Sequence, residues 1–67
     1  MANEYWVVPI DAAWVVRFEG GELERFDDKM RAVLRAQGLA KENRPSEVMV
    51  LDRSGAVSER RTFPAND

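Results

Sequence analysis

Lys29-Met-Arg-Ala-Val-Leu-Arg-Ala-Gln-Gly-Leu-Ala-Lys41 is the one segment of this chain whose apolar residues recur with the period of an α-helix. At about 100° per residue, one arc of such a helix collects the apolar side chains. They are Ala32, Val33, Ala36, Leu39 and Ala40. Because most of them are alanine, the helix can approach a sheet closely, and the sheet has to supply the bulky side chains of the core. The sequence therefore predicts one helix packed on a sheet.

The ends of this helix and its internal glycine also carry information. Asp27 or Asp28 is expected to cap the first turn, where a carboxylate accepts N–H groups that lack a partner within the helix. Gly38 lies in the helix interior, where glycine costs about 1 kcal/mol relative to alanine. Either it permits a close contact or the helix frays from this residue. Met30 and Leu34 fall outside the apolar arc and are expected on the outer surface.

Two runs before the helix, residues 5–10 and 14–19, have the aromatic and β-branched composition of strands. Side chains alternate between the faces of a strand, so the second run places Trp14, Val16 and Phe18 on one face. Residues 22–26 that follow are either a loop or a short third strand. Leu23 and Phe26 within them are expected to tuck under the start of the helix.

Two further runs follow the helix. Residues 47–51 are predicted to form a strand, and residues 56–61 return as a more polar edge strand after a hairpin turn that places Gly55 at positive φ. Phe63 can fold back on the core. The predicted architecture is an α+β domain of order β-β-α-β-β, with antiparallel hairpins and the helix on one sheet face. Residues 1–67 form a single domain, with an ordered core at 5–63 and a tail at 64–67.

Length and composition restrict how such a domain is stabilised. The chain has 67 residues and contains neither cysteine nor histidine, which excludes disulfides and argues against a transition-metal site. Oligomerisation is the remaining source of extra stability. No apolar run approaches the roughly 20 residues that span a bilayer, and the amino terminus lacks the regions of a signal peptide. The sequence therefore predicts a cytoplasmic protein.

Charge and residue types also restrict the function. The formal net charge is −2, from 12 acidic and 10 basic residues mixed along the chain, which argues against a dominant phosphate-binding surface. Without histidine or cysteine, a general base would need a carboxylate or lysine with a strongly shifted pKa. No serine or threonine has a recognisable activating neighbour. We therefore expect no enzymatic activity, no cofactor and no metal.

Short motifs follow one another along the chain. They are Trp6-Val-Val-Pro9, Trp14-Val-Val-Arg17 with Glu19-Gly20, Arg35-Ala-Gln-Gly-Leu-Ala40, and Glu47-Val-Met-Val-Leu-Asp-Arg-Ser-Gly55. Their order and spacing resemble the bacterial domain of unknown function 2188, over roughly residues 5–63. The resemblance implies a small strand-strand-helix-strand-strand domain of bacteria and their mobile elements, with no established activity, cofactor or catalytic residue. Trp6 and Leu51 stand where the family pattern has histidine, which shifts this chain toward apolar character.

The first functional hypothesis is a protein-interaction module that forms a homodimer or binds another protein. If Trp14 faces the helix, alternation along each strand leaves an apolar set on the opposite sheet face. This set is Trp6, Val8, Val15, Met49 and Leu51. Monomers rarely expose a contiguous apolar patch larger than a few hundred Å², so we expect a second copy to cover it. In the competing interpretation the first strand is shifted by one residue, and Trp6 points inward.

The second hypothesis is a small nucleic-acid-binding domain, in which Trp6 stacks on bases and arginines near the sheet edges meet phosphates. The arginines concerned are Arg17, Arg53, Arg60 and Arg61. They are interleaved with Glu19 and Glu59, which favours a solvated polar edge instead. The sequence therefore favours the protein-interaction module.

Overall fold

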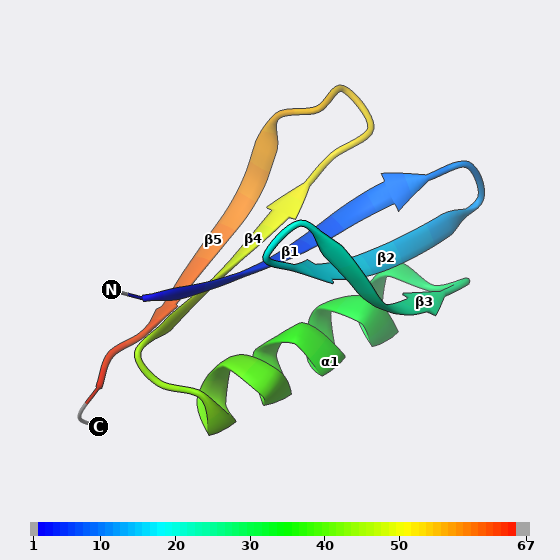
Figure 1. Cartoon of the computed structure of the whole chain (residues 1–67). Helices are drawn as coiled ribbons and strands as arrows, with labels where there is room; N and C mark the ends of the chain where they lie inside the picture. Colours follow the sequence, from blue (N-terminus) through cyan, green and yellow to red (C-terminus); the bar gives the residue numbers. More distant parts are fainter. Residues whose placement is uncertain (1, 66–67) are drawn as a thin grey trace.

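The computed structural model describes residues 2–65 and contains a five-stranded sheet with one helix on one of its faces (Figure 1). The elements are β1 (Asn3–Ile10), β2 (Ala13–Phe18), β3 (Gly21–Phe26), α1 (Lys29–Glu42), β4 (Ser46–Leu51) and β5 (Val57–Phe63). The predicted α+β class and the packing of the helix on the sheet are confirmed. Residues 22–26, which the sequence left open, lie in the third strand.

The strand order in the sheet is β3-β2-β1-β4-β5, so β1 is central and β3 and β5 are the edges. Neighbouring strands are antiparallel, except that β1 and β4 run parallel. This parallel pair results from α1, which carries the chain from the β3 edge back across the sheet before β4 begins (Figure 1). Pro9 lies beyond the last paired residue of the β1–β4 ladder, Val7 with Val50, so its missing N–H leaves that ladder intact.

The helix begins at the predicted cap and continues through its glycine. Asp28 rather than Asp27 is the cap, and its Oδ1 accepts a 3.2 Å hydrogen bond from the Met30 N–H. The helix runs to Glu42, and a Cβ added at Gly38 would meet nothing within 4 Å. Both alternatives for Gly38 were therefore wrong, because the helix neither frays there nor makes a close contact.

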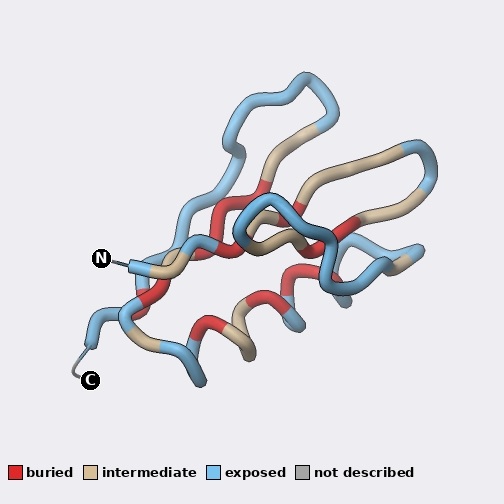
Figure 2. Tube along the Cα trace, in the orientation of Figure 1, coloured by how far each residue is buried: buried red, intermediate tan, exposed pale blue. Residues whose placement is uncertain are grey.

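The core lies between α1 and the sheet, as Figure 2 shows. The sheet contributes the large side chains and the helix mainly alanines, as predicted. The core residues are Tyr5, Val7, Val16, Ala32, Val33, Ala36, Ala40, Val48, Val50 and Phe63, with Trp14, Phe18, Phe26 and Leu39 packed at the border. The prediction for Leu23 was wrong, because this side chain is 50% exposed.

The carboxyl end of the chain follows β5. Phe63 is buried at the end of that strand, so the chain returns to the core there. Residues 66–67 of the predicted tail lie outside the described residues. Within residues 2–65, no helix is long and apolar enough to cross a membrane.

Candidate functional site: the open face of the sheet

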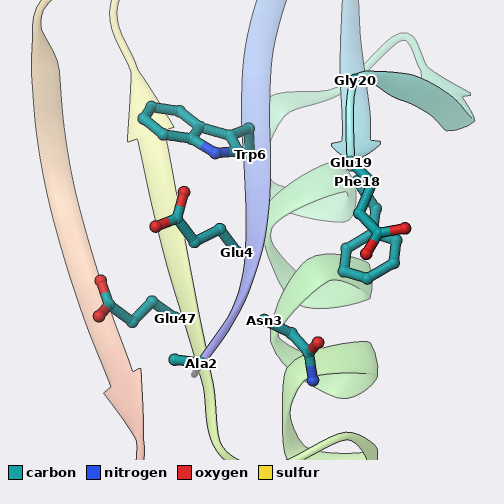
Figure 3. A pocket seen from close by; sticks show the side chains of 8 residues that line it. All are labelled: Ala2, Asn3, Glu4, Trp6, Phe18, Glu19, Gly20 and Glu47. Atoms are coloured by element: carbon teal, nitrogen blue, oxygen red, sulfur yellow. The ribbon is translucent and has the colours of Figure 1, made fainter.

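The sheet face opposite α1 carries the apolar set predicted from alternation, and we call it the open face. Tyr5 and Val7 of β1 are buried in the core on the helix side, so Trp6 between them points to the other side. Figure 3 shows the Trp6 ring on the side of the sheet away from the helix. The interpretation in which Trp6 points inward was therefore wrong.

Strand register arranges the side chains of the open face in two rows, of which the first is paired across all five strands. The Trp6 row consists of Glu22, Arg17, Trp6, Met49 and Arg60, in the order from β3 to β5. The Val8 row joins Arg25, Val15 and Val8 by register, and it continues with the pair of Leu51 and Val57, which follows the last β1–β4 pair, Val7 with Val50. Each row is apolar in its centre, and the arginines and Glu22 lie on or next to the edge strands.

Not every apolar residue of the open face reaches solvent. Val15 and Met49 are buried, at 0% and 1% exposure, although the helix lies on the other side. The Trp6 indole extends over β4, the strand of Met49 (Figure 3), and Val15 lies between Val8 and Arg25 of the neighbouring strands. Trp6, Val8 and Leu51 are partly exposed. The patch expected in water is therefore smaller than predicted, because two of its five members are already shielded.

The arginines of the two rows already have polar partners. Arg25 makes a double contact with Glu22, with both N–O distances at 3.1 Å. This contact lowers the pKa of Glu22 and raises the pKa of Arg25, chiefly through the side-chain hydrogen bond between them. Arg17 Nη2 donates to the Gly20 carbonyl at 2.7 Å, and Arg60 Nε lies 3.8 Å from a Glu47 carboxylate oxygen.

The four arginines proposed for nucleic-acid contacts are not gathered on one surface. Arg17 and Arg60 lie on the open face with Trp6 and Met49 between them. Arg61 pairs with the core residue Val48, so it lies on the helix side of β5. Arg53 lies in the β4–β5 loop, where its Nη1 donates to the Asp11 carbonyl at 2.9 Å and its guanidinium lies 5.4 Å from the Trp14 ring centroid.

A hollow of about 740 Å³ adjoins Trp6 at the end of the sheet where β1 begins (Figure 3). It is lined by Ala2, Asn3, Glu4, Trp6, Phe18, Glu19, Gly20 and Glu47. All charged groups in this lining are carboxylates, which repel phosphate. Among residues 2–65, no cluster of three or more Asp, Glu, His or Cys side chains is arranged to hold a metal ion.

Sequence reasoning missed three members of the two rows, namely Glu22, Arg25 and Val57, which lies next to Leu51. The cause is a register shift in the ladder at each edge of the sheet. It lies between Val16 and Arg17 in the β2–β3 ladder and between Val50 and Leu51 in the β4–β5 ladder. A bulge changes which residues share a face, so alternation counted along the sequence gives the wrong side. The turn residues Gly20 and Gly21 were the available signal that β3 exists.

Within residues 2–65, one helix lies on one face of a mixed five-stranded sheet and no helix lies on the other, which defines a small two-layer α+β domain. The chain belongs to the domain of unknown function 2188 family, described as an uncharacterised protein conserved in bacteria, whose model matches residues 5–63. This match confirms the resemblance of the motifs. No curated protein and no solved structure matches the chain. The function therefore has to be argued from the geometry of the domain.

Proposed function

We propose that this protein is a non-catalytic protein-interaction module that associates with a second copy of itself through the open face. The observation that carries the proposal is the position of Trp6, at the centre of a sheet face that no helix covers in the described part of the chain. Val8 and Leu51 flank it and are also partly exposed. The proposal includes the cytoplasmic location predicted from the sequence.

The composition of the open face supports an interface. Interfaces combine an apolar centre, enriched in Trp and Met, with a polar rim in which Arg is common. Here Trp6 and Met49 occupy the centre of their row, while Arg25 and Arg60 lie on the two edge strands. A domain of this length buries only about 60% of its unfolded surface, so covering the open face would add stability that a single core does not supply.

The charge on the open face supports a second copy as the partner. Arg17, Arg25 and Arg60 are matched by Glu22 in the same rows and by Glu47 beside Arg60. Opposite charges are thus interspersed, and two copies of the face do not confront each other with one dominant sign. A symmetric pair would bury the same surface on both copies, as an isologous interface requires.

Sedimentation equilibrium of the parent protein and two leucine variants tests the proposal. We expect a dimer at micromolar concentration and a monomer for Leu51→Glu, because a charge would be buried at the centre of the interface. Leu34→Glu is the matched control, since Leu34 is 60% exposed on the outer helix surface, and this variant should remain dimeric. A parent protein that is monomeric at all concentrations, or a Leu51→Glu protein that dimerises like the parent, would refute the proposal.

The nucleic-acid hypothesis is tested by the same preparation. Fluorescence anisotropy with labelled single-stranded and duplex oligonucleotides, at low and moderate salt, should give no saturable binding. Micromolar binding that weakens as salt rises would replace the proposed function with nucleic-acid recognition by Trp6 and the arginines.

A further inference from the structure

We infer that the two copies stack with their β1 strands antiparallel, about a two-fold axis that crosses the strands between the Trp6 row and the Val8 row. This inference rests on the proposed function, because it uses the open face as the contact. Sheets that pack face to face in the aligned class keep their strand directions within about 30° of each other. The strands of the two copies can therefore run parallel or antiparallel, and the side chains of the rows decide between the two arrangements.

An axis across the strands places the Trp6 row of one copy against the Val8 row of the other. The opposed pairs are Glu22 with Arg25, Arg17 with Val15, Trp6 with Val8, Met49 with Leu51, and Arg60 with Val57. Each pair occurs twice because of the symmetry. The large indole of Trp6 meets the smaller Val8, and the aliphatic stem of Arg60 covers Val57, which is 48% exposed in the single chain.

The same axis makes the β3 rims complementary in charge. Glu22 of one copy faces Arg25 of the other, and Arg25 faces Glu22 at the symmetric position. Both side chains are accessible in the single chain, at 38% for Glu22 and 50% for Arg25. Their existing ion pair within β3 can therefore extend to a group of four alternating charges across the interface, without moving a buried side chain.

An axis along β1 gives a less favourable match. It places Trp6 against Trp6 and Glu4 against Glu4 of the second copy, since both residues lie on β1 on the open face. Like charges that are brought together across an interface oppose association, and Glu4 has Glu47 as its neighbour on β4. This arrangement also opposes Glu22 to Arg60 instead of Arg25, which makes the two arrangements distinguishable.

Two single charge reversals and their mixture test the orientation. Glu22→Arg alone and Arg25→Glu alone each place like charges on both β3 rims, so each should raise the dimer dissociation constant about tenfold or more at low salt. An equimolar mixture pairs the new arginine at position 22 of one chain with the new glutamate at position 25 of the other. The heterodimer should therefore form with the parent affinity. The ion pair within a single chain cannot produce this result.

Sedimentation equilibrium measures the dissociation constants, and native mass spectrometry measures the heterodimer by its mass. A heterodimer share well above that given by random exchange of subunits supports the orientation. The orientation is overturned if Arg25→Glu dimerises with the dissociation constant of the parent, or if mixing the two variants gives no more heterodimer than random exchange of subunits. In either case the open-face dimer stands. A parent protein that is monomeric overturns the proposed function and this inference together. Circular dichroism melts of both variants show whether each chain remains folded.

Discussion

Asp28 caps α1 through a single side-chain hydrogen bond, because its Oδ1 accepts from the Met30 N–H at 3.2 Å. Asp28→Ala should lower the free energy of unfolding by about 1 kcal/mol, the usual effect of removing such a cap. Asp27→Ala removes the same group one residue earlier and should change the free energy by less than about 0.5 kcal/mol. Urea denaturation at one fixed protein concentration measures both values. Equal losses for the two variants would contradict the assignment of the cap.

Asp52 lies in a turn whose hydrogen bonds favour the charged form of its carboxylate. The Ser54 hydroxyl donates to it, as do the N–H groups of Ala56 and Ser54, and these bonds lower its pKa. Since the folded pKa lies below the unfolded one, the stabilisation is present above the unfolded pKa and is lost as pH falls through the folded pKa. An NMR titration of the Asp52 carboxyl should give a pKa below the ordinary value, and Ser54→Ala should raise it. An identical pKa in both proteins would contradict the role of the hydroxyl.

Within α1, Gly38 lowers the stability of the helix, and a substitution can remove this effect. Gly38→Ala should raise the free energy of unfolding by about 1 kcal/mol, because a Cβ at this position meets nothing within 4 Å. Gly55 in the β4–β5 turn also has open space around it, but its φ is 91°, which strains any L side chain. Gly55→Ala should therefore lower stability by roughly 1–2 kcal/mol. Thermal melts that shift in the same direction for both variants would contradict this comparison.

Elements differed in how well the sequence predicted them. The helix, its apolar arc and the inward side of β2 could be predicted, because a single periodicity determines each of them. The third strand could not be assigned, because Leu23 falls at a bulge and the remaining residues of β3, apart from Phe26, are charged or at a turn. A register shift in the β4–β5 ladder likewise prevented the sequence from predicting that Val57 lies beside Leu51. Local patterns lose their meaning where an extra residue is inserted into a ladder.

For the molecule as a whole, the division into a helix side and an open face could be predicted, whereas the strand order could not. Alternation places Trp6 and Leu51 opposite the helix once the inward residues are known. Nothing local indicates that β4 pairs with β1 rather than with β3, because that choice depends on where α1 crosses the sheet. The burial of Met49 could not be predicted from the sequence either, since it depends on the direction in which the Trp6 indole extends over β4.

The two tryptophans of the chain lie on opposite sides of the sheet, which gives a direct optical test of the dimer. In a Trp14→Phe protein the only indole is Trp6, which is partly exposed in the single chain and covered in the proposed dimer. Its emission should move to shorter wavelength, and its quenching by acrylamide should decrease, as concentration rises through the dissociation constant. A Trp6→Phe protein is the matched control. Its Trp14 packs at the border of the core on the helix side, so its emission should not depend on concentration. A Trp6 signal that stays constant while sedimentation shows a dimer would place the interface elsewhere on the molecule.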